Sequence, residues 1–204
     1  MLSRALPAAL ALALTLTPSP AQSHGLISSP PARAPGGATA AACGQAIADA
    51  IAGDATSHVE GLPELGARDP GYDPAACNVW LCRGLQFGDN AANVQAWAPG
   101  QEVNVRVELT IPHAGAANVS LVDTAADAVV GGAPLISWPA GYADEAAFYA
   151  GATPADQTDF NVTIPTDLGD RCATAGACVL QWWWYGTGAK QTYESCVDFT
   201  VAEA

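Results

Sequence analysis

The sequence predicts an all-β fold, an antiparallel β-sandwich, and three observations support this prediction. Residues 102–111 read EVNVRVELTI, where apolar and polar residues alternate strictly, as in a half-buried strand. Further short strand-like segments follow at intervals, separated by turns with Gly, Pro and Asp. No helical patterns alternate with these segments, which disfavours a parallel α/β sheet.

The two halves of the chain differ in pattern. Residues 24–100 are rich in Gly, Pro and Ala and show little periodicity, so we expect long loops pinned by disulfides, with one short helix at 45–52. The second half holds the strands expected at 102–111, 118–122, 159–164, 178–185 and 196–201.

The first 23 residues have the composition of a secretory signal peptide. Arg4 precedes an apolar stretch that is too short to span a bilayer, and Ala21 and Ser23 are small residues typical of a cleavage site. Cleavage after Ser23 would leave residues 24–204, which we interpret as one domain beginning at His24. No later apolar span or lipid-anchor signal is visible, so we expect a secreted, extracellular protein.

Six cysteines in a secreted chain indicate disulfide bonds rather than metal thiolates. The short spacings favour the pairs Cys77 with Cys82 and Cys172 with Cys178, which would leave Cys43 to pair with Cys196, although other pairings remain open.

The chain is strongly acidic. Its net charge is −13, and loss of Arg4 with the leader makes it −14. Such a surface repels nucleic acids and anionic membranes, whereas a neutral polymer would be indifferent to it. Solubility alone is an equally open explanation of the acidity. Sequons at Asn118 and Asn161 agree with a secreted glycoprotein if the source is eukaryotic.

The sequence contains three histidines, His24, His58 and His113. A free N-terminal histidine can chelate a metal ion through its α-amine and its ring, and a second imidazole would complete a T-shaped site of three nitrogens, which suits Cu(II). His113 is the better second ligand, because it follows the expected strand end and precedes small residues. His58 lies in a loop without regular support. Each histidine could also be incidental.

Gln191 and Tyr193 are two residues apart and would share one face of a strand near Cys196. The tyrosine could cover the axial side of a copper ion, and the glutamine could bond an oxygen species. Alternatively, Tyr193 is a core residue beside a structural disulfide.

These features resemble the lytic polysaccharide monooxygenases, the secreted copper enzymes of the chitin-binding type 4 kind and their fungal relatives. The leader ending before His24, the opening HGLISSPPAR and the second histidine in PHAGAANVS carry the resemblance. The ending WWWYGTGAKQTYESCVDF is most similar to the fungal chitin-active branch. The resemblance implies an immunoglobulin-like or fibronectin III-like sandwich.

The resemblance also implies the site and its chemistry. His24 and His113 would be the metal ligands of one copper ion, with Tyr193 as the axial residue. Gln191 and Tyr193 would be the catalytic residues. An external electron donor would reduce the copper, and O2 or H2O2 would then serve to remove hydrogen from C1 or C4 at a glycosidic bond. The expected partners are an insoluble polysaccharide, chitin first and cellulose or hemicellulose next, and a redox partner or small-molecule reductant. We expect a monomer that binds neither nucleic acid nor membrane.

Two other functions remain open from the sequence. The chain could bind copper through the same histidines without oxidising a substrate, or it could be a metal-free carbohydrate-binding domain. Aromatic residues in the loop-rich half could stack on sugar rings or lie in the core; they are Tyr72, Trp80, Phe87 and Trp97.

Overall fold

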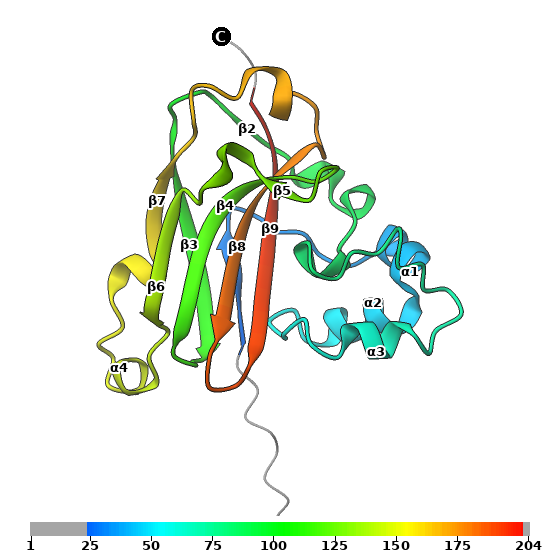
Figure 1. Cartoon of the computed structure of the whole chain (residues 1–204), viewed down its shortest axis with the longest axis horizontal. Coiled ribbons are helices and arrows are strands. Elements are labelled where there is room, and N and C mark those ends of the chain that lie inside the picture. Colours follow the sequence, from blue (N-terminus) through cyan, green and yellow to red (C-terminus); the bar gives the residue numbers. More distant parts are fainter. Residues whose placement is uncertain (1–23, 202–204) are drawn as a thin grey trace, which may run out of the picture.

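A computed structural model of the protein describes residues 24–201. These residues form a β-sandwich with a helical region packed against one side (Figure 1). The expected leader, residues 1–23, lies outside the described residues.

Two sheets make the sandwich. The smaller sheet has the strand order β1–β3–β7, formed by β1 (His24–Ser29), β3 (Glu102–Ile111) and β7 (Asp159–Thr163). The larger sheet has the order β2–β9–β8–β4–β5, and β6 also pairs with β4. Its strands are β2 (Gln95–Trp97), β4 (Gly115–Asp123), β5 (Ala128–Val129), β6 (Ile136–Tyr142), β8 (Cys178–Gly186) and β9 (Gln191–Val201). The sandwich predicted from the sequence is therefore confirmed, with β2 parallel to β9 and the other pairs antiparallel.

The strictly alternating segment is β3 with the predicted bounds, and its valines are buried. β1 was not predicted, because its sequence HGLISS lacks alternation. It forms through pairing with β3, where His24 lies opposite Ile111. Hydrogen bonding to the neighbouring strand β3 therefore stabilises an extended conformation that the local sequence pattern does not indicate.

Residues 37–93 contain more regular structure than the expected loops. The predicted helix is α2 (Gln45–Gly53), and it is accompanied by α1 (Gly37–Cys43) and α3 (Leu62–Gly66). Ile47, Ile51 and Val59 form part of a small core between them. The remaining helices are α4 (Glu145–Tyr149) and the short 3-10 turns η1 (Cys82–Gly84), η2 (Phe87–Asp89), η3 (Ala91–Asn93), η4 (Val130–Gly132), η5 (Ala155–Gln157) and η6 (Gly169–Cys172).

The main core lies between the two sheets. Trp182 and Trp184 of β8 are fully buried there, as their spacing of two residues along a strand requires. Trp97 is also buried and stacks on Phe199, with ring centroids 4.8 Å apart. Of the two alternatives for Trp97, sugar stacking or a place in the core, the structure supports the core.

Two of the three disulfides differ from the pairs that spacing favoured. Cys172–Cys178 is confirmed, but the other bonds are Cys43–Cys77 and Cys82–Cys196. Cys43 and Cys77 meet inside the small helical core, and Cys82 faces β9 from the turn η1. Because the helical region packs against the larger sheet, each of these cysteines pairs with the one nearest to it in space and not with the one nearest in sequence.

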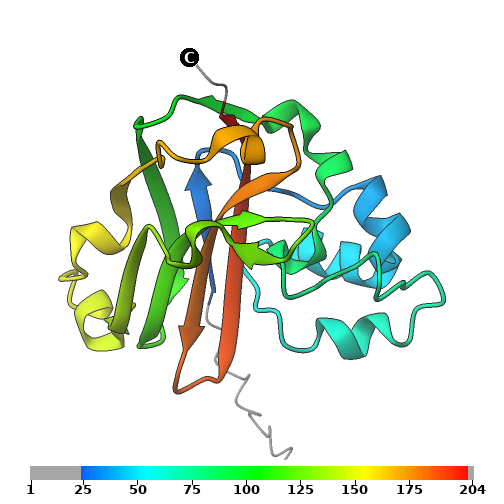
Figure 2. The same ribbon diagram turned by 45° about the horizontal axis from the view of Figure 1, so that its top comes forward.

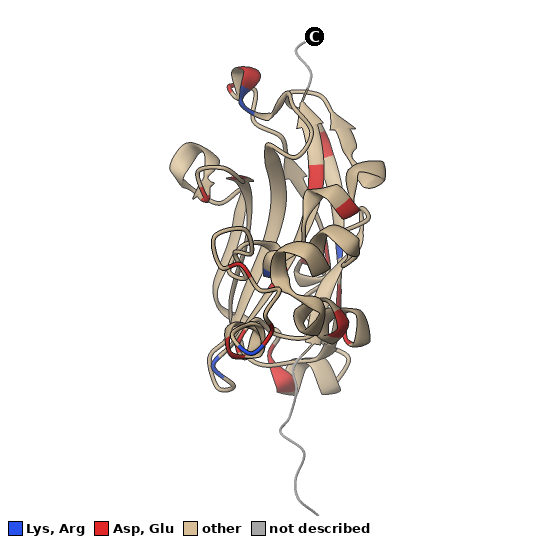
Figure 3. Cartoon of the chain, turned by 90° about the vertical axis from the view of Figure 1, so that its right-hand side faces the viewer, with Lys and Arg blue, Asp and Glu red and all other residues tan. Residues whose placement is uncertain are grey.

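Acidic residues are spread over the side that carries the helices, with few basic residues among them (Figure 3). Within residues 24–201, no helix is long and apolar enough to cross a membrane.

Candidate metal centre

The candidate site lies at one end of the sandwich. The start of β1, the loop after β3, α4 and the turn between β8 and β9 meet at the lower end in Figures 1 and 2. The register of the paired strands explains why these segments lie together. His24 pairs with Ile111, which is two residues before His113, and a Cβ built on Gly186 would lie 2.9 Å from the Cβ of His113. Gly186 in turn pairs with Gln191. The structure therefore brings the predicted residues to one end.

His113 is held from one side of its ring. Its Nδ1 lies 3.2 Å from Oε1 of Glu145, the first residue of α4. Its Nε2 is buried and has no hydrogen-bond partner among the described residues. Burial opposes ionisation of Glu145, but the backbone N–H groups of Glu145 and Ala114 and the contact with His113 outweigh it, so the pKa of this carboxyl is lowered. Glu145 is therefore a fixed anion beside the imidazole.

His24 is contacted by the segment that follows α2. Its Nε2 lies 2.6 Å from Oδ2 of Asp54, although the pair lacks the alignment of a hydrogen bond. The other oxygen of Asp54 accepts hydrogen bonds from the backbone N–H and the hydroxyl of Thr56. Burial opposes ionisation of Asp54, yet these bonds and the charges of His24 and Arg83 lower its pKa. In addition, the N–H of Gly25 donates to the carbonyl of Thr56. These contacts hold the segment against the beginning of β1.

Gln191 and Tyr193 lie on the same face of β9, as the sequence predicted. The hydroxyl of Tyr193 donates to Oε1 of Gln191 over 2.8 Å. The Tyr193 ring is fully buried and stacks on Trp184, with centroids 4.4 Å apart. This position fits both interpretations from the sequence, an axial residue at a metal and a residue of the core.

His58 is better supported than the sequence suggested. The neighbouring Val59 donates its N–H to the carbonyl of Thr192, and Glu60 accepts two hydrogen bonds from Thr192. The His58 ring stands edge-on to Tyr193, with centroids 6.3 Å apart. His58 therefore lies at the edge of the candidate site.

Sequence reasoning missed the buried charges beside this site. Arg83 is almost fully buried, and its guanidinium donates to the carbonyls of Asp54 and Ala55 and to the hydroxyl of Ser57. Its backbone N–H donates to Oε2 of the buried Glu194. Burial lowers the pKa of Arg83 to about 10 and raises that of Glu194 to about 7. Only Glu194 could have been linked to the site from the sequence, because it is next to Tyr193. The local sequence around Arg83, Asp54 and Glu145 contains no such signal.

The side chains alone do not form a complete metal site. Across residues 24–201, no group of three or more His, Cys, Asp and Glu side chains is arranged to hold a metal ion. Two imidazoles are available, and the partnerless Nε2 of His113 is a donor suited to a metal. A third nitrogen would come from the α-amine of His24 if the chain is cut before that residue. This donor set fits Cu(II).

Residues 24–199 match the family described as lytic polysaccharide mono-oxygenase, cellulose-degrading. The chain belongs to the lytic polysaccharide monooxygenase family. The matched region begins at His24 and reaches into β9, so it includes all the candidate site residues. The closer similarity to the fungal chitin-active branch stays a prediction.

Two solved structures are similar to this family member. A lytic polysaccharide monooxygenase from Jonesia denitrificans is 17% identical over 88% of this chain and 100% of its own, with a TM-score of 0.41. A chitin binding domain from Burkholderia pseudomallei is 14% identical with the same coverage and a TM-score of 0.46. No curated protein matches the sequence significantly.

Proposed function

We propose that the chain cut before His24 is a secreted, copper-dependent monooxygenase that cleaves a neutral structural polysaccharide. The observation that carries the proposal is the buried, partnerless Nε2 of His113 at the end of the sandwich where β1 begins with His24. The family match, which also begins at His24, supports a cut at this residue. Three disulfides are consistent with an oxidising compartment.

The positions of the residues support the following roles. His24, through its amine and ring, and His113, through Nε2, would hold one copper ion. Copper, reduced by an external electron donor, would supply the redox chemistry that lets O2 or H2O2 oxidise C1 or C4 of a sugar. Tyr193 would close the axial side, and its bond to Gln191 fixes the orientation of both polar groups. The acidic surface disfavours anionic polymers and leaves neutral ones as candidates. Chitin is the first substrate to test, because the end of the sequence resembles the chitin-active branch, and cellulose is the second.

Copper affinity tests the ligand set directly. The chain beginning at His24 should bind Cu(II) tightly in calorimetry, because an amine and two imidazoles act together. An extra alanine before His24, or the change His113→Ala, should weaken binding by at least about 100-fold, since each removes a nitrogen donor. His58→Gln is the matched control and should leave the affinity unchanged. Equal affinity in all four proteins would exclude this ligand set.

Product analysis tests the activity. The copper-loaded protein should release oxidised oligosaccharides from chitin or cellulose with ascorbate and O2, detected by mass spectrometry. Tight copper binding without product from any polysaccharide would instead indicate a copper-binding protein that performs no oxidation. Polysaccharide binding without copper affinity would indicate a carbohydrate-binding domain.

A further inference from the structure

We propose that Glu145 is a positioning residue that fixes the tautomer of His113, so that Nε2 is the atom presented to the metal. This inference rests on the proposed function, because it concerns the same site. Glu145 does not contact the bound ion in this proposal. It acts only through the imidazole of His113, from the opposite side of the ring.

The tautomer follows from the kinds of atoms in contact. A glutamate carboxylate is ionised near neutral pH and can then only accept hydrogen bonds. At 3.2 Å, Nδ1 of His113 must therefore carry the proton that this carboxylate accepts. In a neutral imidazole the other nitrogen then keeps its lone pair. That nitrogen is the buried Nε2, which has no hydrogen-bond partner among residues 24–201.

The contact is needed because water favours the opposite tautomer. A neutral histidine side chain in water carries its proton mainly on Nε2, where it would block metal binding. A carboxylate that accepts from the far ring nitrogen reverses this preference and also sets the ring orientation, as outer partners of metal-bound histidines generally do. Glu145 is in the position of such an outer partner.

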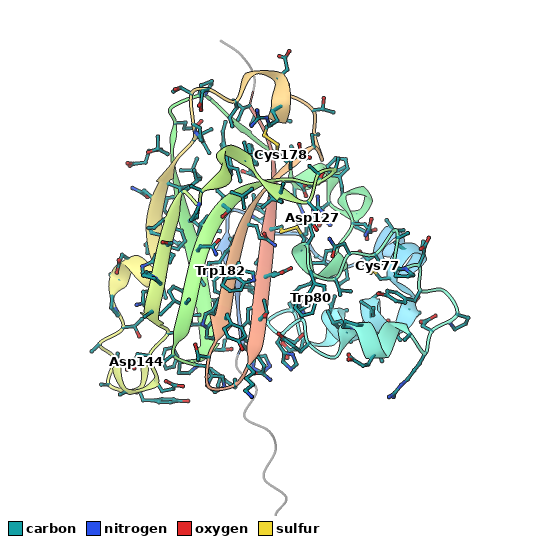
Figure 4. The ribbon with its side chains drawn as sticks, in the orientation of Figure 1. Cys77, Trp80, Asp127, Asp144, Cys178 and Trp182 are labelled. Atoms are coloured by element: carbon teal, nitrogen blue, oxygen red, sulfur yellow. A yellow bond between two sulfur atoms is a disulfide. The ribbon has the colours of Figure 1, made fainter. Side chains whose placement is uncertain are left out.

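Several hydrogen bonds restrain Glu145, whose side chain is 45% exposed. Its carboxylate also accepts from the backbone N–H of Ala114, which is next to His113 in the chain. α4 is capped by Asp144, whose side chain accepts from the N–H of Ala147 over 2.9 Å. Figure 4 labels Asp144 at the same end of the sandwich. The segment before α4 is fixed by Gln157, which accepts from the N–H of Ala143. The bond from Ala114 restrains the carboxylate, and the other two restrain the backbone around it.

The test compares two changes at one position. In the metal-free chain beginning at His24, nitrogen-edited NMR should show the proton of neutral His113 on Nδ1. Glu145→Ala should move it towards Nε2 and weaken Cu(II) binding by about 10- to 100-fold. Glu145→Gln should restore the wild-type tautomer and most of the affinity, because the amide oxygen still accepts from Nδ1. Glu64→Ala removes an exposed carboxylate from α3 and should change neither measurement.

The outcomes separate this inference from the proposed function. A proton on Nε2 of His113 in the wild-type protein would overturn the inference even if no variant folds. Wild-type copper affinity and an unchanged tautomer in folded Glu145→Ala would also overturn it, while the copper site itself would stand. Absence of copper binding by the wild-type protein would refute the proposed function, and the tautomer in the metal-free protein would still decide the role of Glu145.

Discussion

Glu194 illustrates how single buried charges support the candidate site. It follows Tyr193 in β9, so its side chain points to the opposite face of the strand, where it accepts the backbone N–H of Arg83. Arg83 then holds the carbonyls of the segment that contains Asp54, beside His24. The site is therefore supported by groups that do not belong to its sequence motifs.

The raised pKa of Glu194 predicts a pH dependence of stability. Burial raises the pKa to about 7 from an ordinary 4.5, against the opposing effect of Arg83. Between these two pKa values the folded state binds more protons than the unfolded state. The free energy of unfolding should therefore fall by up to about 3 kcal/mol as the pH rises from about 4.5 to about 7. Urea denaturation across this range measures the slope. Glu194→Gln should flatten it; an unchanged slope in that variant would rule out Glu194 as its source.

The hydroxyl of Tyr193 predicts a small and separable effect. Tyr193→Phe removes the hydrogen bond to Gln191 but keeps the stack on Trp184, so it should cost about 1 kcal/mol of stability. If the ring only covers the axial side of copper, Cu(II) affinity should change little, whereas the electron paramagnetic resonance spectrum should shift. A large loss of affinity in calorimetry would instead make the hydroxyl a strong ligand.

At the scale of elements, the helical region and the sandwich are joined by one disulfide. Cys82–Cys196 spans 114 residues and ties η1 to β9, whereas Cys172–Cys178 spans 6. Because a longer closed loop restricts the unfolded chain more, replacing the first pair by alanine should destabilise the protein by about 2 kcal/mol more than replacing the second. Denaturant unfolding of the two double variants measures the difference, and equal losses would contradict it.

The helix α4 offers an aromatic side chain that the sequence analysis did not single out. Tyr149 is 73% exposed and lies on the element that carries Glu145. Trp80 is 51% exposed but belongs to the helical region beside β9 (Figure 4).

If the polymer lies across the end with the histidines, Tyr149→Ala should weaken binding to insoluble chitin or cellulose several-fold, because a ring that stacks on sugars is lost. Copper affinity should not change. Pull-down isotherms measure binding to the polymer. Trp80→Ala is the matched control, and it should change this binding less than Tyr149→Ala does. A larger effect of Trp80→Ala would place the polymer on the helical side.

At the scale of the whole molecule, the acidic surface predicts which polymers are excluded. Acidic side chains are distributed over the helical side rather than gathered in one patch (Figure 3). Binding to a neutral polysaccharide should therefore depend little on salt, whereas an anionic polysaccharide should not be retained at low salt. Binding measured at low and high salt checks this, and strong retention of the anionic polymer would contradict it.

The sequence by itself determined the sandwich, the bounds of β3, the helix α2 and the shared face of Gln191 and Tyr193. These features depend on side-chain periodicity, which is local. It also determined the family, through motifs at the two ends of the chain.

Only the tertiary structure decided the disulfide pairs around Cys43 and Cys82, the strand β1, and the carboxylates that face the two histidines. Asp54 and Glu145 reach His24 and His113 from segments far away in sequence. Nothing in their local pattern signals that approach, because it arises from the packing of a helical layer and of α4 against the same end of the sandwich.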